Sequence, residues 1–339
     1  MSRQTPMLFQ DTLQILEDAL ARLCLPFGRE RGLLLSFLIH GVFASKEEAQ
    51  CGLVDPQQGF TVGMLRDFLE HFTREGYRFL APPDLARELC PREKYVLLTF
   101  DDGYFNNTRT LPLLEAFNVP AVFFISSEHV KRGKAFWWDA VYRESKKRRR
   151  PSEELSCMVA EYKKMKTPQI EADIRSRFGS SALSPVSDLD RPFSAAELKR
   201  FAMHRLVFLG NHTRDHAILA NYSVEGVREQ IAGCQQVLRH ITGKAPQIIA
   251  YPNGNCSEAI CEAACRAGLR FGLLAAAGRN RLPLDPGTPQ AMTLKRFTLW
   301  GNRPVEAQCR ASQSWISVHR FLKFLQRDLA LKDLPYRSV

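Results

Sequence analysis

The stretch Tyr95-Val-Leu-Leu-Thr-Phe-Asp-Asp-Gly-Tyr104 determines how this chain is interpreted. Its first six residues are all apolar or threonine, which is the pattern of a strand covered on both faces in a parallel sheet. The strand ends on two adjacent carboxylates, Asp101 and Asp102, followed by a glycine turn. Burying a carboxylate costs several kcal/mol unless a cation or hydrogen bonds compensate it. The pair is therefore expected to bind a cation or to take part in chemistry.

The same alternation of apolar runs and amphipathic patterns extends to both sides of this strand. Strands separated by crossover helices form a parallel sheet with right-handed connections. About seven such units without a Gly-x-Gly-x-x-Gly motif favour an α/β fold of the closed or nearly closed (β/α) barrel type over a doubly wound sheet. Strands are predicted at residues 33–39, 76–80, 95–100, 120–126, 206–210, 246–251 and 269–275, and helices at 11–23, 61–75, 83–89, 108–117, 223–242 and 257–267.

Three segments flank or interrupt the predicted barrel of residues 33–300. Residues 1–32 are expected to form an N-terminal helical extension, and residues 301–339 are expected to form a C-terminal helical tail. The insertion at about 135–201 is rich in Lys, Arg, Ser and Glu and has little strand character, so we expect a helical cap over part of the barrel rim.

The composition predicts a globular protein of the cytoplasm. With 339 residues, 45% of them hydrophobic, the chain can bury a large core. It has neither the roughly 20 apolar residues of a membrane span nor an N-terminal signal pattern. Its nine cysteines are odd in number and scattered, as expected for reduced thiols. Cys261-Glu-Ala-Ala-Cys265 falls on a predicted helix, where packing is favoured over metal binding.

The net charge of +11 is concentrated in the run Lys146-Lys-Arg-Arg-Arg150. A solvated helix end is the simplest explanation of this run, and peripheral contact with an anionic membrane surface or an acidic glycan is the alternative. Nucleic acid is not an expected partner, because no zinc finger, helix-turn-helix or aromatic RNA-binding motif accompanies the charge.

A second cluster of polar residues, His212-Thr-Arg-Asp-His216, follows the apolar run at 206–209. Two histidines four apart share one face of a helical turn, so both imidazoles can bind one metal at about 2.0–2.1 Å. Two histidines and a strand-end carboxylate with open positions are typical of a hydrolytic zinc site or a non-haem iron site. The residues that follow apolar strands, and so share one rim of the barrel, are Asp101, Asp102, His212, His216, Tyr251 and Asn253.

Two aspartates indicate divided labour, one as a metal ligand and the other as a base. A divalent ion lowers the pKa of its bound water to roughly 7, so a neighbouring carboxylate can complete the deprotonation. Hydrolysis of an amide or ester follows from such chemistry. The alternative for Asp101 and Asp102 is a helix cap or turn pair before Thr108.

These motifs, in this order and spacing, resemble the polysaccharide deacetylase family, the NodB-homology carbohydrate esterases. The likeness extends from about residue 33 to 296. The resemblance implies a distorted (β/α) barrel, a divalent metal that is usually zinc, and hydrolytic removal of N-acetyl or O-acetyl groups from sugars. The similar motifs are Thr99-Phe-Asp-Asp-Gly103, His212-Thr-Arg-Asp-His216 and Tyr251-Pro-Asn-Gly254, together with Ile39-His-Gly-Val42 and Phe136-Trp-Trp-Asp139.

Position by position, the resemblance implies that Asp101 is the general base and that Asp102, His212 and His216 hold the metal. The backbone N–H of Tyr251 corresponds to the donor that helps to stabilise the oxyanion, a contribution of about 2.7–4 kcal/mol elsewhere.

Two parts of the family pattern are missing. Ala250-Tyr-Pro-Asn253 lacks the arginine that orients the base, and His40 or Arg296 are the candidates to replace it. The late Leu-x-His motif, which supplies a general acid, has no match. His40 is a candidate acid because it ends a predicted strand, but a structural histidine is favoured. Trp137 and Trp138 either stack on a sugar ring or anchor the cap.

Three functions follow for the chain. The leading hypothesis is a hydrolase that depends on a divalent metal, with zinc as the expected ion, and removes acetyl groups from N-acetylated sugars, with a carbohydrate as its substrate. The second is removal of a formyl or other acyl group from a lipid-linked sugar. The third, motivated by the missing arginine and acid, is a catalytically silent carbohydrate-binding protein.

Overall fold

The computed structural model describes residues 32–314 of the chain. The predicted helix at 11–23 and the part of the predicted tail beyond residue 314 lie outside the described residues. Residues 32–302 belong to one compact unit, and residues 303–314 belong to a second one, in which α12 (Val305–Gln313) is the helix.

The first unit is built on one curved sheet, in the order β7-β6-β5-β4-β3-β1-β8, with β2 paired to β3 and β9 paired to β1. Every pairing is parallel except that of β1 with β8, as expected when crossover helices connect the strands. The strands are β1 (Leu33–Ile39), β2 (Tyr77–Phe79), β3 (Lys94–Phe100), β4 (Ala121–Ile125), β5 (Val207–Asn211), β6 (Ile248–Ala250), β7 (Phe271–Leu273), β8 (Arg279–Arg281) and β9 (Phe297–Thr298).

The central strands have the burial that their apolar runs predict. In both β1 and β3, six of the seven residues are buried, and the two strands pair from Leu34 opposite Tyr95 to Ile39 opposite Phe100. Alternate side chains therefore point into the barrel and towards the helices outside it. Polar residues begin where these strands end.

The sheet curls, and the segment at 294–299 joins its two sides. The Leu294 amide donates to the Gly272 carbonyl of β7 at 2.8 Å, and the Arg296 amide donates to the Ala276 carbonyl at 2.9 Å. Further along, the Leu299 amide donates to the Leu38 carbonyl of β1 at 3.2 Å. The prediction of an α/β fold of the distorted (β/α) barrel type is confirmed.

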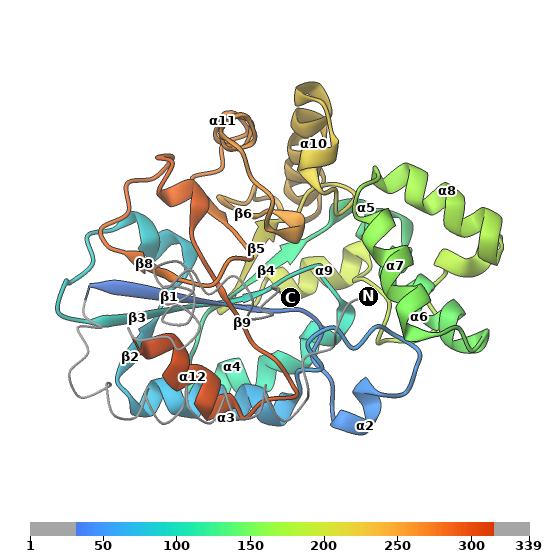
Figure 1. Ribbon diagram of the computed structural model, residues 1–339. Helices are drawn as coiled ribbons and strands as arrows, with labels where there is room; N and C mark the ends of the chain where they lie inside the picture. Colours follow the sequence, from blue (N-terminus) through green and yellow to red (C-terminus); the bar gives the residue numbers. More distant parts are fainter. Residues whose placement is uncertain (1–31, 315–339) are drawn as a thin grey trace, which may run out of the picture. The chain divides into compact units, whose positions relative to one another are not determined.

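Helices surround this curled sheet, with α3 and α4 below it and α10 and α11 above it in the view of Figure 1. Within residues 32–314, no helix has both the length and the apolar character needed to cross a membrane. The helices of the first unit are α2 (Lys46–Ala49), α3 (Val62–Arg74), α4 (Leu111–Phe117), α5 (Ser127–Arg132), α6 (Trp137–Lys147), α7 (Ser152–Tyr162), α8 (Thr167–Phe178), α9 (Ala195–Ala202), α10 (Val224–Thr242) and α11 (Glu258–Arg266). The short 3₁₀ helices are η2 (Pro82–Ala86), η3 (Phe105–Thr110), η4 (Ser180–Leu183), η5 (Leu219–Asn221), η6 (Pro252–Gly254) and η7 (Ala291–Thr293).

Local capping explains where the main helices begin. Thr61, Ser223 and Ser257 have extended backbones, and each side chain accepts a hydrogen bond from the amide three residues later. The helix predicted at 83–89 is instead the 3₁₀ helix η2, which begins with two prolines that have no amide to donate. The insertion at 135–201 is helical as predicted, and α6, α7 and α8 group together in green in Figure 1.

Candidate metal centre and active site

Asp101 and Asp102 follow directly after β3, where the chain leaves the sheet. Both are buried, with 3% and 1% of their surfaces exposed. Asp102 has a φ of 77° and Gly103 a φ of 88°, so the turn uses left-handed backbone at two consecutive residues. A Cβ atom at Gly103 would lie 3.0 Å from Ile125, which explains the glycine. The turn directs the two carboxylates into different surroundings.

The carboxylate of Asp101 is held by Arg296. Two parallel hydrogen bonds run from Nη1 and Nη2 of the guanidinium to the two carboxylate oxygens, at 2.7 and 2.8 Å. Arg296 is itself 1% exposed, and its other donors bind the Leu274 carbonyl and the Thr99 hydroxyl. Burial opposes ionisation of Asp101, but the nearby charges of Arg296 and His212 outweigh it and lower the pKa. Asp101 is therefore an oriented, ionised carboxylate at neutral pH.

Asp102 lies between the two predicted histidine ligands. Its Oδ1 atom is 3.3 Å from Nε2 of His212 and 3.2 Å from Nε2 of His216. Burial opposes ionisation of Asp102, but the charge of His40 and the interactions with the imidazoles of His212 and His216 outweigh it and hold the pKa well below its usual range. The same His212 Nε2 atom is 3.9 Å from the Asp101 carboxylate. The structure thus brings all four predicted side chains together.

The two histidines converge through a loop and not through a helical turn, which corrects the sequence-based geometry. The segment between them has left-handed φ values at Thr213 (63°) and His216 (51°). For a β-branched residue such as Thr213 this conformation is unfavourable and needs support. The Asn211 side chain accepts from the Thr213 amide at 2.8 Å, and the Thr213 hydroxyl accepts from the Ala217 amide at 2.7 Å. These hydrogen bonds hold the loop in place.

The hydrogen bonds of the rings determine which nitrogens face the site. Nδ1 of His212 lies 2.8 Å from the Ala250 carbonyl at the end of β6. A carbonyl only accepts, so Nδ1 carries the proton and Nε2 presents a lone pair towards Asp102. Nδ1 of His216 is buried without a partner among the described residues. Burial opposes charge on both rings, but the neighbouring aspartates raise the pKa of His212, whereas burial prevails and lowers the pKa of His216.

The three groups fit a tetrahedrally coordinated cation. Their ligand atoms all lie within 4.8 Å of one another, and no second such cluster of His, Cys, Asp or Glu occurs within residues 32–314. Bonds of about 2.0–2.1 Å in a tetrahedral site separate two ligand atoms by roughly 3.3 Å, which matches the separations of Asp102 Oδ1 from both imidazoles. Within residues 32–314, no group donates a hydrogen bond to Asp102 Oδ1, although this atom is fully buried. A cation would compensate this carboxylate.

The Tyr251 amide does not have the expected place in the site. Its N–H donates to the Leu273 carbonyl of β7 at 3.1 Å, so it is used in the sheet and not directed at a substrate. The Tyr251 ring packs beneath α10 and α11, with its hydroxyl 3.8 Å from the Cys261 sulfur. The Asn253 side chain is exposed and donates a hydrogen bond to the Asn255 side chain, so it does not contribute to the ligand cluster. Local strand pairing accounts for this difference from the prediction.

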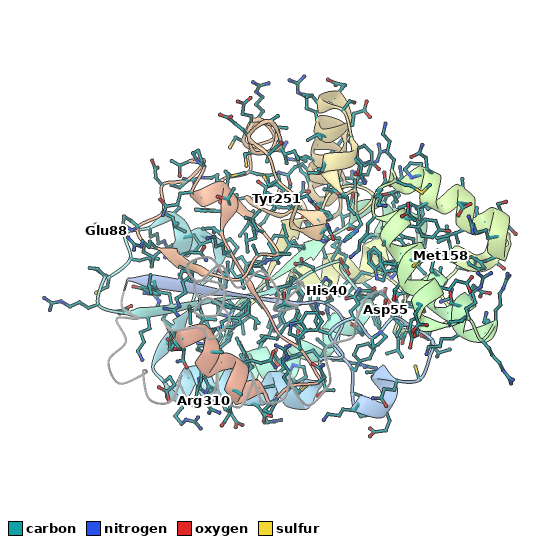
Figure 2. All side chains as sticks on the ribbon, in the orientation of Figure 1. His40, Asp55, Glu88, Met158, Tyr251 and Arg310 are labelled. Atoms are coloured by element: carbon teal, nitrogen blue, oxygen red, sulfur yellow. The ribbon has the colours of Figure 1, made fainter. Side chains whose placement is uncertain are left out.

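His40 lies at the same edge of the sheet, directly after β1. Its Nδ1 atom is 2.7 Å from the Gln58 side chain, and its half-buried ring contributes to the low pKa values of both Asp101 and Asp102. Figure 2 shows His40 and Asp55 in the same region of the molecule, and the charge of His40 also acts on the Asp55 carboxyl. Nε2 of His40 makes no hydrogen bond within the described part of the chain.

A hydrogen-bond network links this edge to the insertion. The Tyr104 hydroxyl donates to Asp139 at 2.7 Å and accepts from the Trp138 indole at 2.8 Å. Gln57 reaches both Tyr104 and Asp102, at 3.4 and 3.5 Å. The Trp138 ring packs against His216 with centroids 4.5 Å apart. Trp138 is therefore an anchor between α6 and a candidate ligand, and its neighbour Trp137 is buried in the core of the insertion.

The sequence leaves the role of Arg296 open and assigns no role to Tyr104. Arg296 was one of two candidates to replace the missing arginine, and the structure places it on Asp101. Tyr104 and Asp139 carried a weak signal, since each stands within a quoted motif, but their pairing joins positions 35 residues apart.

Comparison with known proteins agrees with this geometry. The sequence model described as polysaccharide deacetylase matches residues 88–272, which is more than half of the chain and includes all four converging side chains. No curated protein matches the chain.

Several solved structures share the fold. The deacetylase PplD of Streptococcus pyogenes, solved with acetate, aligns with a TM-score of 0.56 at 16% identity, covering 83% of this chain and 99% of that one. IcaB from Ammonifex degensii aligns with a TM-score of 0.55 at 18% identity over 83% and 97% of the two chains. A polysaccharide deacetylase from Bacillus cereus gives 0.55 at 16% identity over 83% and 69%. With its matching motifs, family model and barrel, the chain belongs to the polysaccharide deacetylase family, whose members are hydrolases of carbon–nitrogen bonds other than peptide bonds.

Proposed function

We propose that this protein is a metal-dependent deacetylase of N-acetylated sugars, in which Asp101 is the base and Asp102, His212 and His216 hold the ion. The observation that carries the proposal is the different pairing of the two adjacent aspartates. Asp101 is clamped by Arg296 through both oxygens, whereas Asp102 faces two imidazole nitrogens. One carboxylate is thus oriented beside the ligand cluster, and the other is a member of it.

The donor set supports zinc as the ion. Two imidazoles and one carboxylate with an open position are the usual ligands of a hydrolytic zinc site. When bound, the ion would lower the pKa of a water molecule to roughly 7, polarise the acetyl carbonyl and stabilise the oxyanion. Because the Tyr251 amide is used in the sheet, we assign it no part in oxyanion stabilisation.

Two side chains of the protein, Asp101 and His40, would transfer the protons of the reaction. Asp101 stays ionised because of Arg296, and it would accept a proton from the attacking water. His40 stands beside both aspartates with Nε2 unpaired within residues 32–314, so it would deliver a proton to the leaving amine nitrogen. This assigns His40 the role that the missing Leu-x-His motif left open.

The other two hypotheses have less support. The catalytically silent protein was motivated partly by the missing arginine, and Arg296 now occupies that place on the base. Removal of a formyl group uses the same site, so no contact separates it from deacetylation. Parallel assays with acetylated and formylated forms of one amino sugar oligomer would distinguish the two substrates.

The test of the base is Asp101→Asn. Acetate release from an N-acetylated oligosaccharide should fall by about 10²- to 10⁴-fold, the usual contribution of a general base. The zinc content, measured by elemental analysis, should stay at the wild-type level. Asp102→Asn is the matched variant, and it should lose both activity and zinc. Full activity in Asp101→Asn would refute the assignment.

The test of the acid is His40→Gln. Turnover should fall by about 10²-fold or more, and the alkaline limb of the pH–rate profile should disappear, because that limb reports the acid. His204→Gln is the control, since the His204 ring pairs with the exposed Glu115 and accepts from the Leu206 amide, and contacts neither aspartate. An unchanged alkaline limb in His40→Gln would assign the proton donor elsewhere.

A further inference from the structure

Two cysteine thiols lie in contact at the turn that follows β6. Cys256 ends this turn, and Cys261 lies in the first half of α11. Their sulfur atoms are 3.0 Å apart, and both residues are free thiols of intermediate exposure. The Cys261 sulfur also lies 3.8 Å from the Tyr251 hydroxyl. The site described above uses none of these sulfurs.

We propose that Cys256 and Cys261 form a reversible disulfide, so that this turn is an oxidation-sensitive modification site. The oxidant is a peroxide, either hydrogen peroxide or an organic hydroperoxide. The Cys261 thiolate attacks the peroxide oxygen, the O–O bond breaks, and a sulfenic acid and one water or alcohol form. The Cys256 sulfur then attacks the Cys261 sulfur and expels a water. Both thiols lose their protons, and the peroxide is reduced by two electrons.

The surroundings distinguish Cys261 as the attacking sulfur. The hydrogen bond from the Cys256 thiol outweighs burial and lowers the pKa of Cys261 to about 7, with a further contribution from Tyr251. A thiol with a pKa near ambient pH combines a substantial thiolate fraction with good nucleophilicity. Cys265, one turn further along the same helix, has a raised pKa because of burial. It is therefore the matched control for Cys261.

Formation of the disulfide would shift the backbone of the turn after β6, which lies at the edge of the sheet that carries the candidate metal ligands. A disulfide needs sulfurs about 2.05 Å apart, so the two must approach from 3.0 Å. The turn has little freedom to absorb this shift. Gly254 has a φ of 74°, and a Cβ atom there would lie 2.7 Å from the Ala275 amide. The residue before Tyr251 is Ala250, whose carbonyl orients His212. This expectation rests on the proposed function: oxidation of the two thiols should lower the turnover of acetylated substrate severalfold.

The disulfide is tested on the full chain by peptide mapping. After treatment with hydrogen peroxide and alkylation of the remaining thiols, we expect a cross-link between the peptides that contain Cys256 and Cys261, lost on treatment with dithiothreitol. Cys256→Ser and Cys261→Ser should abolish the cross-link, and Cys265→Ser should retain it. If peroxide oxidises only the exposed cysteines 51, 90 and 157, or leaves sulfinic acid at Cys261, the proposal is wrong.

Turnover provides a separate readout. Acetate release should fall severalfold in the oxidised wild type, recover with dithiothreitol, and be insensitive to peroxide in Cys256→Ser. A cross-linked protein with unchanged turnover would overturn the link to the site. If the reduced protein releases no acetate, the proposed function fails, while the peptide map still decides whether the disulfide forms.

Discussion

At the scale of single residues, the pairing of Arg296 with Asp101 defines the candidate active site. A guanidinium binds both oxygens of a carboxylate in a fixed plane, which a lysine cannot do. Here both partners are buried, and the guanidinium is anchored further by Leu274 and Thr99. The pair therefore orients the carboxylate and also keeps it ionised.

Variants at Arg296 separate these two effects. In Arg296→Gln the positive charge is lost, so burial should raise the pKa of Asp101. Activity requires ionised Asp101, and the acidic limb of kcat/KM should therefore move to higher pH. In Arg296→Lys the charge remains, so this limb should stay near its wild-type position while kcat falls by about tenfold or more through lost orientation.

Stability measurements provide the control for these variants. Removing one partner of a buried ion pair costs about 3–5 kcal/mol, so urea denaturation at pH 7 should show a loss in Arg296→Gln and a smaller one in Arg296→Lys. A pH profile that is the same in Arg296→Gln as in the wild type would show that Asp101 is not the group that titrates on the acidic limb.

At the scale of elements, α6 is tied to the end of β3 by one phenol group. The Tyr104 hydroxyl binds both Trp138 and Asp139 in α6, and all three residues are buried. Asp139 also accepts from the Asp55 amide, at 3.0 Å. The Tyr104 hydroxyl therefore joins α6 to the turn that contains Asp102. The Trp138 ring of the same helix also packs against the His216 ring.

Tyr104→Phe should therefore destabilise the protein. The change leaves the Trp138 N–H and one Asp139 oxygen buried without their partner, and such losses cost about 1–3 kcal/mol. Tyr162→Phe is the matched control, because its hydroxyl binds the more exposed Asp173 within the insertion. The free energies of unfolding in urea should rank the wild type, Tyr162→Phe and Tyr104→Phe in decreasing order. Equal losses in the two variants would contradict a special role for the Tyr104 link.

At the scale of the whole molecule, the ligand cluster joins the ends of two strands that are distant in sequence. Asp102 follows β3, and both histidines follow β5, so an ion bound there would cross-link two parts of the sheet. A ligand that binds only the folded state adds stability by mass action.

Metal removal should therefore affect both activity and stability. A chelator should abolish acetate release, and zinc should restore it. At a free zinc concentration 100 times Kd, the folded state should gain about 2.7 kcal/mol, observed as a higher thermal midpoint. His216→Ala should lose this gain, and the surface variant His204→Ala should keep it. Equal stabilisation by zinc in both variants would exclude the proposed ligand set.

The basic run at 146–150 bears on the partners of the whole molecule. It ends α6, and the guanidinium groups of Arg148 and Arg150 lie 4.8 and 5.8 Å from the Phe178 ring. Lys146, Lys147, Arg148 and Arg149 are exposed, although Lys147 also pairs with Glu144. Contact of this run with an anionic membrane surface or an acidic glycan stays a prediction.

The sequence by itself determined the alternation of strands and helices and the rim on which the chemistry lies. Apolar runs such as 95–100 identify buried parallel strands locally, and their carboxyl ends meet at one edge of a sheet. Asp101, Asp102, His212 and His216 therefore follow from local patterns. Helix starts such as Thr61 were equally predictable, because a cap is a contact within a few residues.

Only the tertiary structure decided which partner each polar group takes. Arg296 reaches Asp101 across 195 positions because the segment at 294–299 joins β7 to β1, and no local pattern encodes that contact. Likewise, the Tyr251 amide donates to the Leu273 carbonyl and is not available to a substrate. The two histidines converge through loop residues with left-handed backbone, and not on one face of a helix. Such pairings depend on how distant segments pack, which periodicity along the chain does not contain.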